Sequence, residues 1–349
     1  MAFYDGLFDT LGLRDWCDGA GDGGPMTMAE LLAKSSGRTA EEAAADPTPL
    51  LQTPFPSLDA LNDACPAVTR TRDMTDGVEN AFLAIKDPLK VVLDPITQPL
   101  SWALNGSLEM FQAIPWFVLI PLLGLLVWVA SRSAGLVAFV IGSFLFLGFI
   151  DHYVYAVQTL SIIFVCTLIC VALGVPVGIA MSRSDTMQRA TIPVLDMLQT
   201  LPTFVYLIPL IFLFSVTEPK LYGIAIILYA IVPVIRLTDL GIRLVDKDVI
   251  EAADAFGMSD RQKLWGVQVP LALPNIMAGV NQTIMMSLAM VVIASLVSAP
   301  GLGVLVLRGI RNLELGVGLV SGFGIVLLAV LLDRVTKAAL SRINVSQKA

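Results

Sequence analysis

Glu-Ala-Ala-Asp-Ala-Phe-Gly, at Glu251–Gly257, is the most informative part of this sequence, and Pro270 follows it thirteen residues later. Together they form the pattern E-A-A-x3-G-x9-V-x-V-P. Two long runs flank this pattern, and both are too apolar for anything except membrane spans. A polar, helix-forming loop between two spans must lie in water, so we expect a soluble partner to bind it.

The composition of the whole chain places it in a lipid bilayer. Of its 349 residues, 56% are hydrophobic and 15% are charged, whereas an ordinary soluble domain has about 25% charged residues. The mean hydropathy is +0.78. Backbone polar groups that face lipid must be paired within the protein, and the sequence contains no alternating segments typical of a membrane barrel. The composition therefore predicts an all-α polytopic membrane protein.

Apolar runs divide the chain into spans, because a helix needs about 20 apolar residues to cross the hydrocarbon layer. We expect about seven spans. The first two are short, and only Ser131 and Arg132 separate them. The expected spans cover residues 114–130, 133–150, 153–181, 192–216, 221–238, 276–299 and 315–333.

Lysine and arginine predict the orientation, because cytoplasmic loops carry an excess of both. If the loop 239–275 is cytoplasmic, twelve of the fifteen Lys and Arg residues in the membrane part lie on or near the inner side. Lys220, Arg308 and Arg311 then lie outside. This predicts a multi-pass protein of the cytoplasmic (inner) membrane with an extracytoplasmic N-terminus and a cytoplasmic C-terminal tail, residues 336–349.

The N-terminal part is acidic and differs from the rest. Residues 1–94 carry a net charge of −9, and residues 95–349 a net charge of +2. Residues 1–75 are rich in Ala, Asp, Gly, Pro and Thr and contain few aromatic residues. Such a composition predicts a mostly disordered extracytoplasmic tail.

Residues 76–112 carry apolar side chains at three- and four-residue steps among charges, with Pro88 and Pro95 as expected breaks. The stripe predicts amphipathic helices that lie on the outer membrane surface or on the spans. A plain connecting helix explains the pattern equally well. The membrane-spanning domain then covers residues 113–335.

The four cysteines and the single histidine indicate no metal site. Cys166 and Cys170 share one face of a span and are expected to pack as small apolar side chains. Cys17 and Cys65 can pair if the tail lies outside the cytoplasm, but their spacing does not decide this. His152 has no second His or Cys near it in the sequence. We expect no cleaved signal peptide, because the chain starts without a basic segment or an apolar core.

The polar loop contains signals for two short helices joined by a sharp turn. Asp246 or Asp248 can cap the first helix, which includes the paired alanines. Gly257 is suited to end this helix in a left-handed conformation. Ser259 then begins the second helix and forms a capping box with Gln262.

The second short helix carries Arg261 and Trp265, and Pro270 and Pro274 are expected to redirect the chain towards the next span. This predicts an elbow outside the bilayer with an exposed aromatic and basic end. Paired alanines allow another helix or a groove wall to approach closely. A linker that happens to be helical is the alternative.

The stretch resembles the EAA motif of permease subunits of ATP-binding-cassette importers, written E-A-A-x3-G-x9-I-x-L-P. Val267 and Val269 differ from the motif but keep its apolar character. In that family the loop inserts a coupling helix into a cleft of the ATPase, and the fold is the type I importer transmembrane domain. The resemblance therefore implies an ATPase-coupling site that consists of Glu251, Ala252, Ala253, Gly257, Arg261, Trp265, Val267 and Pro270.

Further blocks resemble the permeases of glycine betaine/proline-type importers. One is the proline-rich segment Leu195–Pro209, and another is Pro274–Gln282. Gly301–Gly303 and Leu307–Ile310 are similar in the same way, so the resemblance covers roughly residues 76–335. These blocks indicate the compatible-solute branch of the family.

Breaks and polar residues within the spans indicate a candidate substrate path. Pro202 and Pro209 are expected to interrupt the fourth span, and Pro233 the fifth, and broken helices inside a membrane usually line a cavity. Aromatic ring faces can bind a quaternary ammonium group. Hinge prolines and ordinary packing aromatics are the alternative. The candidate residues are Thr203, Phe204, Tyr206, Asn281 and Gln282.

Pairs of glycines four residues apart allow helices to approach closely. Gly174 and Gly178 form one pair in the third span, and Gly318 and Gly322 form another in the seventh. Contacts between helices of one chain and contacts between two copies both explain them.

The resemblance implies the membrane-spanning permease subunit of an ATP-driven importer. The chain lacks a G-x4-G-K-[ST] phosphate loop, so we expect neither enzyme activity nor a cofactor of its own. Two copies of a cassette ATPase then hold ATP and Mg, and one docking loop per chain implies a homodimer. A periplasmic or extracellular binding protein delivers the substrate. The implied substrates are glycine betaine or related osmolytes such as proline betaine, choline, carnitine, trimethylamine N-oxide and dimethylsulfoniopropionate.

An ion-coupled secondary transporter for small zwitterions is the alternative function. Such transporters place ionisable residues near the middle of the membrane, and many have inverted repeats, of which this sequence shows none. A scaffold or a membrane enzyme has less support, since the spans contain no nucleophile–base pair. Nucleic-acid binding is not expected, because the extended soluble region is acidic. The ionisable residues of the spans lie near their expected cytoplasmic ends: Asp196, Arg236, Asp239, Asp333 and Arg334.

Overall fold

Every regular element in the described part of the computed structural model is a helix, which confirms the all-α prediction. The chain divides into two compact units, residues 1–89 and 90–349. The described residues are 8, 11–13, 17 and 55–348, with the backbone alone for 342–348.

The N-terminal unit contains a disulfide. Cys17 and Cys65 are bonded, with their Cα atoms 4.8 Å apart, and Phe8 and Ala64 belong to the same buried cluster. The helix α5, Leu58–Ala64, ends directly before Cys65. The end of the predicted disordered tail is therefore folded, and the rest of that prediction falls mainly on residues outside the described part.

The helix α6, Thr71–Ala113, begins in the N-terminal unit and continues into the second unit without a break. The predicted breaks at Pro88 and Pro95 are therefore wrong. A proline inside a helix removes one backbone donor, but the turns on both sides keep their hydrogen bonds, so the helix continues. Leu104 of α6 is buried in the core of the second unit.

The second unit contains the apolar helices. Among the described residues, four helices are long and apolar enough to cross a membrane, or up to six if each of two bent pairs is one span. α8 is apolar but has 16 residues, about 24 Å of helix, which is shorter than a hydrocarbon layer of about 30 Å. The seven expected spans therefore stay a prediction. The helices are α7 Trp116–Ser131, α8 Ala134–Phe149, α9 Tyr153–Arg183, α10 Asp185–Thr200, α11 Thr203–Leu213, α12 Pro219–Arg243, α15 Val269–Ala294, η3 Ser295–Val297, α16 Leu302–Arg311 and α17 Leu315–Lys348.

The helices α10 and α11 form a bent pair in the region of the predicted fourth span. They meet at 95°, and Leu201 and Pro202 lie between them in extended conformations, which confirms the predicted break. Pro209 and Pro233 lie inside α11 and α12, so the breaks predicted there are wrong. Each proline removes one backbone donor while the turns on both sides keep their hydrogen bonds, and Pro233 is buried with its carbonyl oxygen close to Gly279 of α15.

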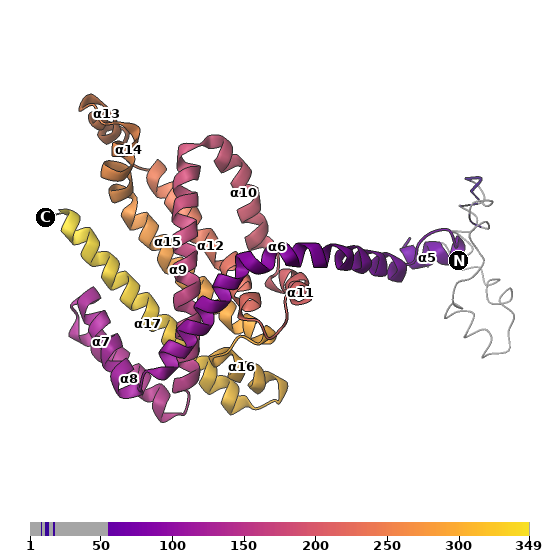
Figure 1. The fold of residues 1–349 in the computed structure, drawn as a ribbon, viewed down its shortest axis with the longest axis horizontal. Helices are drawn as coiled ribbons and strands as arrows, with labels where there is room; N and C mark the ends of the chain where they lie inside the picture. Colours follow the sequence, from indigo (N-terminus) through magenta and orange to yellow (C-terminus); the bar gives the residue numbers. More distant parts are fainter. Residues whose placement is uncertain (1–7, 9–10, 14–16, 18–54, 349) are drawn as a thin grey trace. The chain divides into compact units, whose positions relative to one another are not determined.

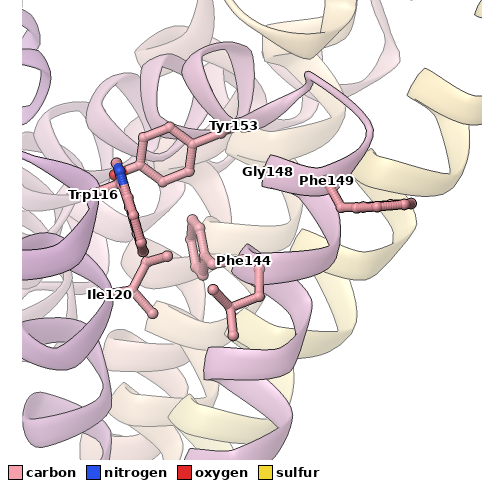
Figure 2. A pocket seen from close by; sticks show the side chains of 7 residues that line it. Trp116, Ile120, Phe144, Gly148, Phe149 and Tyr153 are labelled. Atoms are coloured by element: carbon pink, nitrogen blue, oxygen red, sulfur yellow. The ribbon is translucent and has the colours of Figure 1, made fainter.

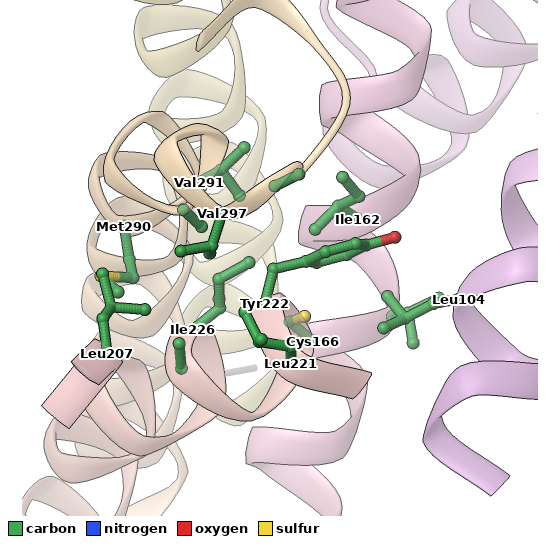
Figure 3. Close-up of a cluster of buried hydrophobic side chains, with 14 of the residues drawn as sticks. Leu104, Ile162, Cys166, Leu207, Leu221, Tyr222, Ile226, Met290, Val291 and Val297 are labelled. Carbon is green, nitrogen blue, oxygen red and sulfur yellow. The ribbon is translucent and has the colours of Figure 1, made fainter. Parts of the chain in front are cut away.

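The helix α12 lies at the centre of the second unit, in contact with α9 and α15 (Figure 1). The main core consists of buried apolar side chains from α6, α9, α11, α12, α15 and η3. Figure 3 shows Tyr222 and Ile226 of α12 between Ile162 of α9 and Val291 of α15.

Glycines of α9 allow it to lie close to α12. A Cβ atom added at Gly178 would lie 2.6 Å from the carbonyl oxygen of Ile235 and 2.6 Å from Thr238 Cβ. Gly174, one turn earlier, faces the same helix. This pair therefore packs within one chain. At Gly322, in the second predicted pair, an added Cβ would have no described neighbour within 4 Å.

A polar elbow, residues 244–268, connects α12 to α15 at one end of the unit (Figure 1). Pro270 and Pro274 lie in α15, so the redirection predicted at these prolines is wrong, and the chain turns at Gly257 instead. The helix continues through both prolines from Asp260 to Val297, since each proline removes only its own backbone donor. The elbow contains α13 Lys247–Ala255, α14 Asp260–Lys263 and the π-helix η2 Leu264–Gln268.

Candidate functional site

Local hydrogen bonds fix both ends of α13. Asp246 Oδ1 accepts a hydrogen bond from the backbone N–H of Asp248 at 3.0 Å, so Asp246 is the cap of the two candidates. At the other end Gly257 has a φ of 74°, and its N–H donates to the carbonyl oxygen of Asp254 at 2.9 Å. Glycine adopts this left-handed helix end at low cost. The predicted stop at Gly257 is confirmed.

A capping box begins α14, as predicted. The N–H of Gln262 donates to Ser259 Oγ at 3.4 Å, and the N–H of Ser259 donates to Gln262 Oε1 at 2.9 Å. Lys263 Nζ then pairs with Asp254 Oδ1 at 2.5 Å and joins α14 to α13. These bonds define the shape of the elbow without a large apolar core.

The elbow exposes two aromatic rings. Phe256, directly before Gly257, is 87% exposed, and Trp265 is 57% exposed. Large apolar side chains exposed on a polar segment outside the spans mark an interaction surface. The sequence reasoning selected Trp265 and missed Phe256, although an aromatic residue directly before a helix-ending glycine was an available signal.

The other predicted coupling residues differ in accessibility. A partner can contact the exposed ones directly, whereas a buried one acts through the shape of the elbow. Glu251, Ala252, Gly257 and Arg261 are exposed, Ala253 is buried, and Val267 and Pro270 are half-buried.

Three predicted path residues lie on the first turn of α11, directly after the bend. Phe204 is 54% exposed. Tyr206 is half-buried, and its hydroxyl donates to Met290 Sδ of α15 at 3.7 Å. Thr203 is also half-buried. The bend therefore places Phe204 at the surface and Tyr206 against α15.

The other two path residues lie on α15. Asn281 Nδ2 donates to Asp333 Oδ1 of α17 at 3.1 Å, and Gln282 is exposed. Thr283 and Ser287, one turn apart, are fully buried, and their hydroxyls have no hydrogen-bond partner among the described residues. Because buried hydroxyls without partners are costly, this face of α15 has unused capacity for water or a polar solute.

The five path residues do not form one cluster in this conformation. Tyr206 contacts α15 at Met290, whereas Asn281 lies nine residues earlier and is bonded to α17. Nine residues of helix correspond to about 13 Å. The structure thus brings together the three residues of α11, and separately the two of α15.

The sequence of the helices and elbow identifies the protein family. Residues 171–345 match the family described as binding-protein-dependent transport system inner membrane component. The chain belongs to this family. The matched region contains the whole elbow with α12 and α15, so the candidate coupling surface lies within the part of the permease that the family shares.

Relatives extend the similarity of the permease towards its N-terminus. The glycine betaine/proline betaine transport system permease protein ProW of Escherichia coli is 39% identical over 290 residues, which cover 83% of this permease and 81% of ProW. The glycine betaine transport system permease protein OpuAB of Bacillus subtilis is 40% identical over 245 residues, which cover 70% and 86%. The inward-facing MetNI methionine ABC transporter matches 53% of this permease and 93% of the solved chain, with a TM-score of 0.48 and 19% identity.

Family membership supports the first of the two functions that the sequence left open. The protein is the permease subunit of a binding-protein-dependent transport system in the inner membrane, with several apolar helices. Permease subunits of this kind are not enzymes. Within the described residues, no group of three or more His, Cys, Asp and Glu side chains is placed to hold a metal ion.

An apolar pocket of about 470 Å³ lies where α7 and α9 begin and α8 ends (Figure 2). Trp116, Phe144, Phe149 and Tyr153 contribute aromatic rings, and none of the lining side chains is charged. None of the predicted site residues lines it. The pocket therefore differs in chemistry from the polar face of α15.

Proposed function

We propose that the permease translocates glycine betaine or a related quaternary amine or osmolyte, which a soluble binding protein delivers. Separate cassette ATPase subunits drive the transport, and they dock on the elbow. The exposure of Phe256 and Trp265 carries this proposal. Both rings lie on a polar segment, and the rest of the permease leaves them exposed.

The geometry of the elbow suits a docking element. Large aromatic side chains supply most of the binding energy at many protein interfaces. The caps at Asp246, Gly257 and Ser259 order the elbow before a partner binds, so docking loses little conformational entropy. Arg261 adds an exposed positive charge to this surface, which suits a partner with an acidic rim.

The number of elbows supports a symmetric assembly. Each chain carries one elbow, and cassette ATPases work as pairs. We therefore propose a homodimer of the permease with two ATPase subunits. ATP and Mg belong to those subunits, because the permease has no phosphate-binding loop.

We place the elbow and the C-terminus in the cytoplasm and the N-terminus outside. The distribution of Lys and Arg supports this orientation. The Cys17–Cys65 disulfide supports it independently, because disulfides persist mainly in oxidising compartments outside the cytoplasm.

The relatives support the substrate class, since ProW and OpuAB are named for betaine transport. Phe204 exposes a ring at the bend, and aromatic faces attract quaternary ammonium groups. Thr203, Tyr206, Asn281 and Gln282 complete the proposed path. Tyr206 and Asn281 are separated in this conformation. A path that includes all five residues therefore requires a different conformation of the permease.

Phe256→Ala tests the docking surface. The side chain is exposed, so the free energy of unfolding should change by no more than about 0.5 kcal/mol. Removal of an interfacial anchor costs about 2 kcal/mol of binding, or roughly 30-fold in the affinity for the ATPase. Co-purification of the ATPase and uptake into vesicles both measure the loss.

Phe149→Ala is the matched control for this test. Phe149 is 88% exposed, but it lies at the end of α8 and not on the elbow. We expect this variant to bind the ATPase and to transport normally. Full ATPase binding by a permease with both Phe256→Ala and Trp265→Ala would refute docking on the elbow.

A transport assay tests which substrate is carried and which energy source drives it. The assay measures uptake of radiolabelled glycine betaine by vesicles that contain the permease, the ATPase and the binding protein. Uptake should require ATP and continue in the presence of a protonophore. Loss of uptake on protonophore addition at constant ATP would contradict the proposal. Asn281→Ala should lower uptake while the complex still assembles.

A further inference from the structure

Ion pairs and hydrogen bonds join α10 to its neighbours in addition to a small apolar cluster, to which α10 contributes Leu195 and Leu198. Among its residues, all of which are described, Leu195 alone is buried. The helix nevertheless contacts α9 and α12 and leads directly to the bend at Leu201 and Pro202 (Figure 1). The apolar contact is small, and a set of polar contacts to α12 adds to it.

Arg243, the last residue of α12, makes the first of these contacts. Its Nη1 donates to Asp185 Oδ1 at the start of α10 at 2.8 Å, and its Nη2 donates to the carbonyl oxygen of Met181 in α9 at 2.8 Å. Its Nε donates to Asp239 Oδ1, one turn earlier in α12, at 2.9 Å. One planar guanidinium thus joins three helices at the base of the elbow.

Asp239 and Arg236 extend this contact along α12. Asp239 is buried, and its second oxygen accepts a hydrogen bond from Gln188 Nε2 of α10 at 2.7 Å. Arg236 pairs with Asp196, further along α10. Arg243, the later arginine of α12, pairs with Asp185, the earlier aspartate of α10, so the two helices run antiparallel. Arg243 and Arg236 therefore form two successive ion pairs between these helices.

We propose that these two ion pairs, Arg243–Asp185 and Arg236–Asp196, couple movement of the elbow to the bend between α10 and α11. The first lies directly before the elbow, and the second lies one turn before Leu201. These residues act as positioning residues, since they do not themselves line the bend. The inference rests on the proposed function, in which an ATPase acts on the elbow.

The exposure of the ion pairs suits such a role. The side chains of Asp185 and Asp196 are largely exposed, and exposed ion pairs are individually weak. They can break and form again during each transport cycle.

Charge reversal at the second ion pair tests the proposal. Asp196→Arg places two positive charges side by side, and the addition of Arg236→Asp restores the attraction. ATP hydrolysis and glycine betaine uptake are measured in the same vesicles with the ATPase and the binding protein. We expect Asp196→Arg to lower uptake per ATP about tenfold with little change in hydrolysis, and the double variant to recover most of it.

Glu314→Arg is the matched control, because it breaks a surface ion pair, Arg308–Glu314 at 3.2 Å, that involves neither the elbow nor α10. It should leave uptake per ATP unchanged. Equal losses of hydrolysis and uptake in Asp196→Arg, or no recovery in the double variant, would overturn the proposal.

If the Asp196→Arg variant does not assemble with the ATPase, the milder variant Asp196→Asn is used, and its uptake per ATP hydrolysed is measured. An unchanged uptake per ATP in that variant also overturns the proposal. Failure of the unmodified permease to bind the ATPase is a different result, since it refutes the proposed function itself.

Discussion

The contact between α9 and α12 and the elbow between α12 and α15 are stabilised in opposite ways. At the contact, Gly178 brings two helices so close that an added Cβ would lie 2.6 Å from the carbonyl oxygen of Ile235. In the elbow, Asp246, Gly257 and Ser259 hold short helices through hydrogen bonds to residues nearby in the sequence. Shape complementarity fixes the first region, and local bonds fix the second.

The difference indicates how far the effect of a substitution spreads. In a close-packed interior, one added methyl group strains backbone and side chains around it. In a capped turn, the loss of one bond is confined to that turn. The elbow can therefore present a surface to a partner while the packing of the spans stays unchanged.

Gly178→Ala should give the largest effect, because the new Cβ would clash with backbone, which cannot rotate away. We expect the free energy of unfolding to fall by about 2–3 kcal/mol, measured by thermal or denaturant unfolding in detergent. Gly322→Ala is the control, since its Cβ meets open space and alanine favours a helix. Equal stability of the two variants would show that the α9–α12 contact is looser than described.

Gly257→Ala should have an intermediate effect that stays within the elbow. The left-handed conformation at φ 74° costs an alanine about 1–2 kcal/mol, although its Cβ would touch nothing within 4 Å. Hydrogen exchange should become faster in α13 and remain unchanged in α12 and α15. Gly266→Ala, within the helical part of the elbow, should not produce this change, and faster exchange in the spans would contradict the comparison.

Ser259→Ala should give the smallest effect, since it removes one half of the capping box. Loss of an N-terminal cap costs about 1 kcal/mol, and the exchange of the first amides of α14 reports it. Arg261→Ala changes an exposed residue of the same helix that caps nothing and serves as the control. If both variants behave alike, the box does not stabilise α14.

The same division explains which features could be predicted from the sequence. The caps at Asp246, Gly257 and Ser259 were predictable because each involves residues at most three positions apart. Trp265 was predictable from its place on the second short helix of the polar loop. Phe256 was missed, because the composition of the loop does not show which way one ring points, and its place directly before Gly257 was the one signal.

The prolines and Arg243 show why the rest could not be predicted. Pro202 lies at the break before α11 and Pro233 lies inside α12, although both were predicted to interrupt a span. Arg243 has hydrogen-bond partners up to 62 residues away, and no local sequence pattern predicts them. The roles of the coupling and path residues stay predictions, since they depend on molecules that bind to the permease.

The two ends of the elbow are joined to the spans unequally. On the side of α12, the three residues Leu244–Asp246 separate the elbow from the helix. On the side of α15, Asp260–Val297 is one continuous helix that includes η2 and α15. A force applied at α14 would therefore reach Thr283 and Ser287 through continuous helical backbone. Towards α12, the same force would pass through three residues that belong to no helix.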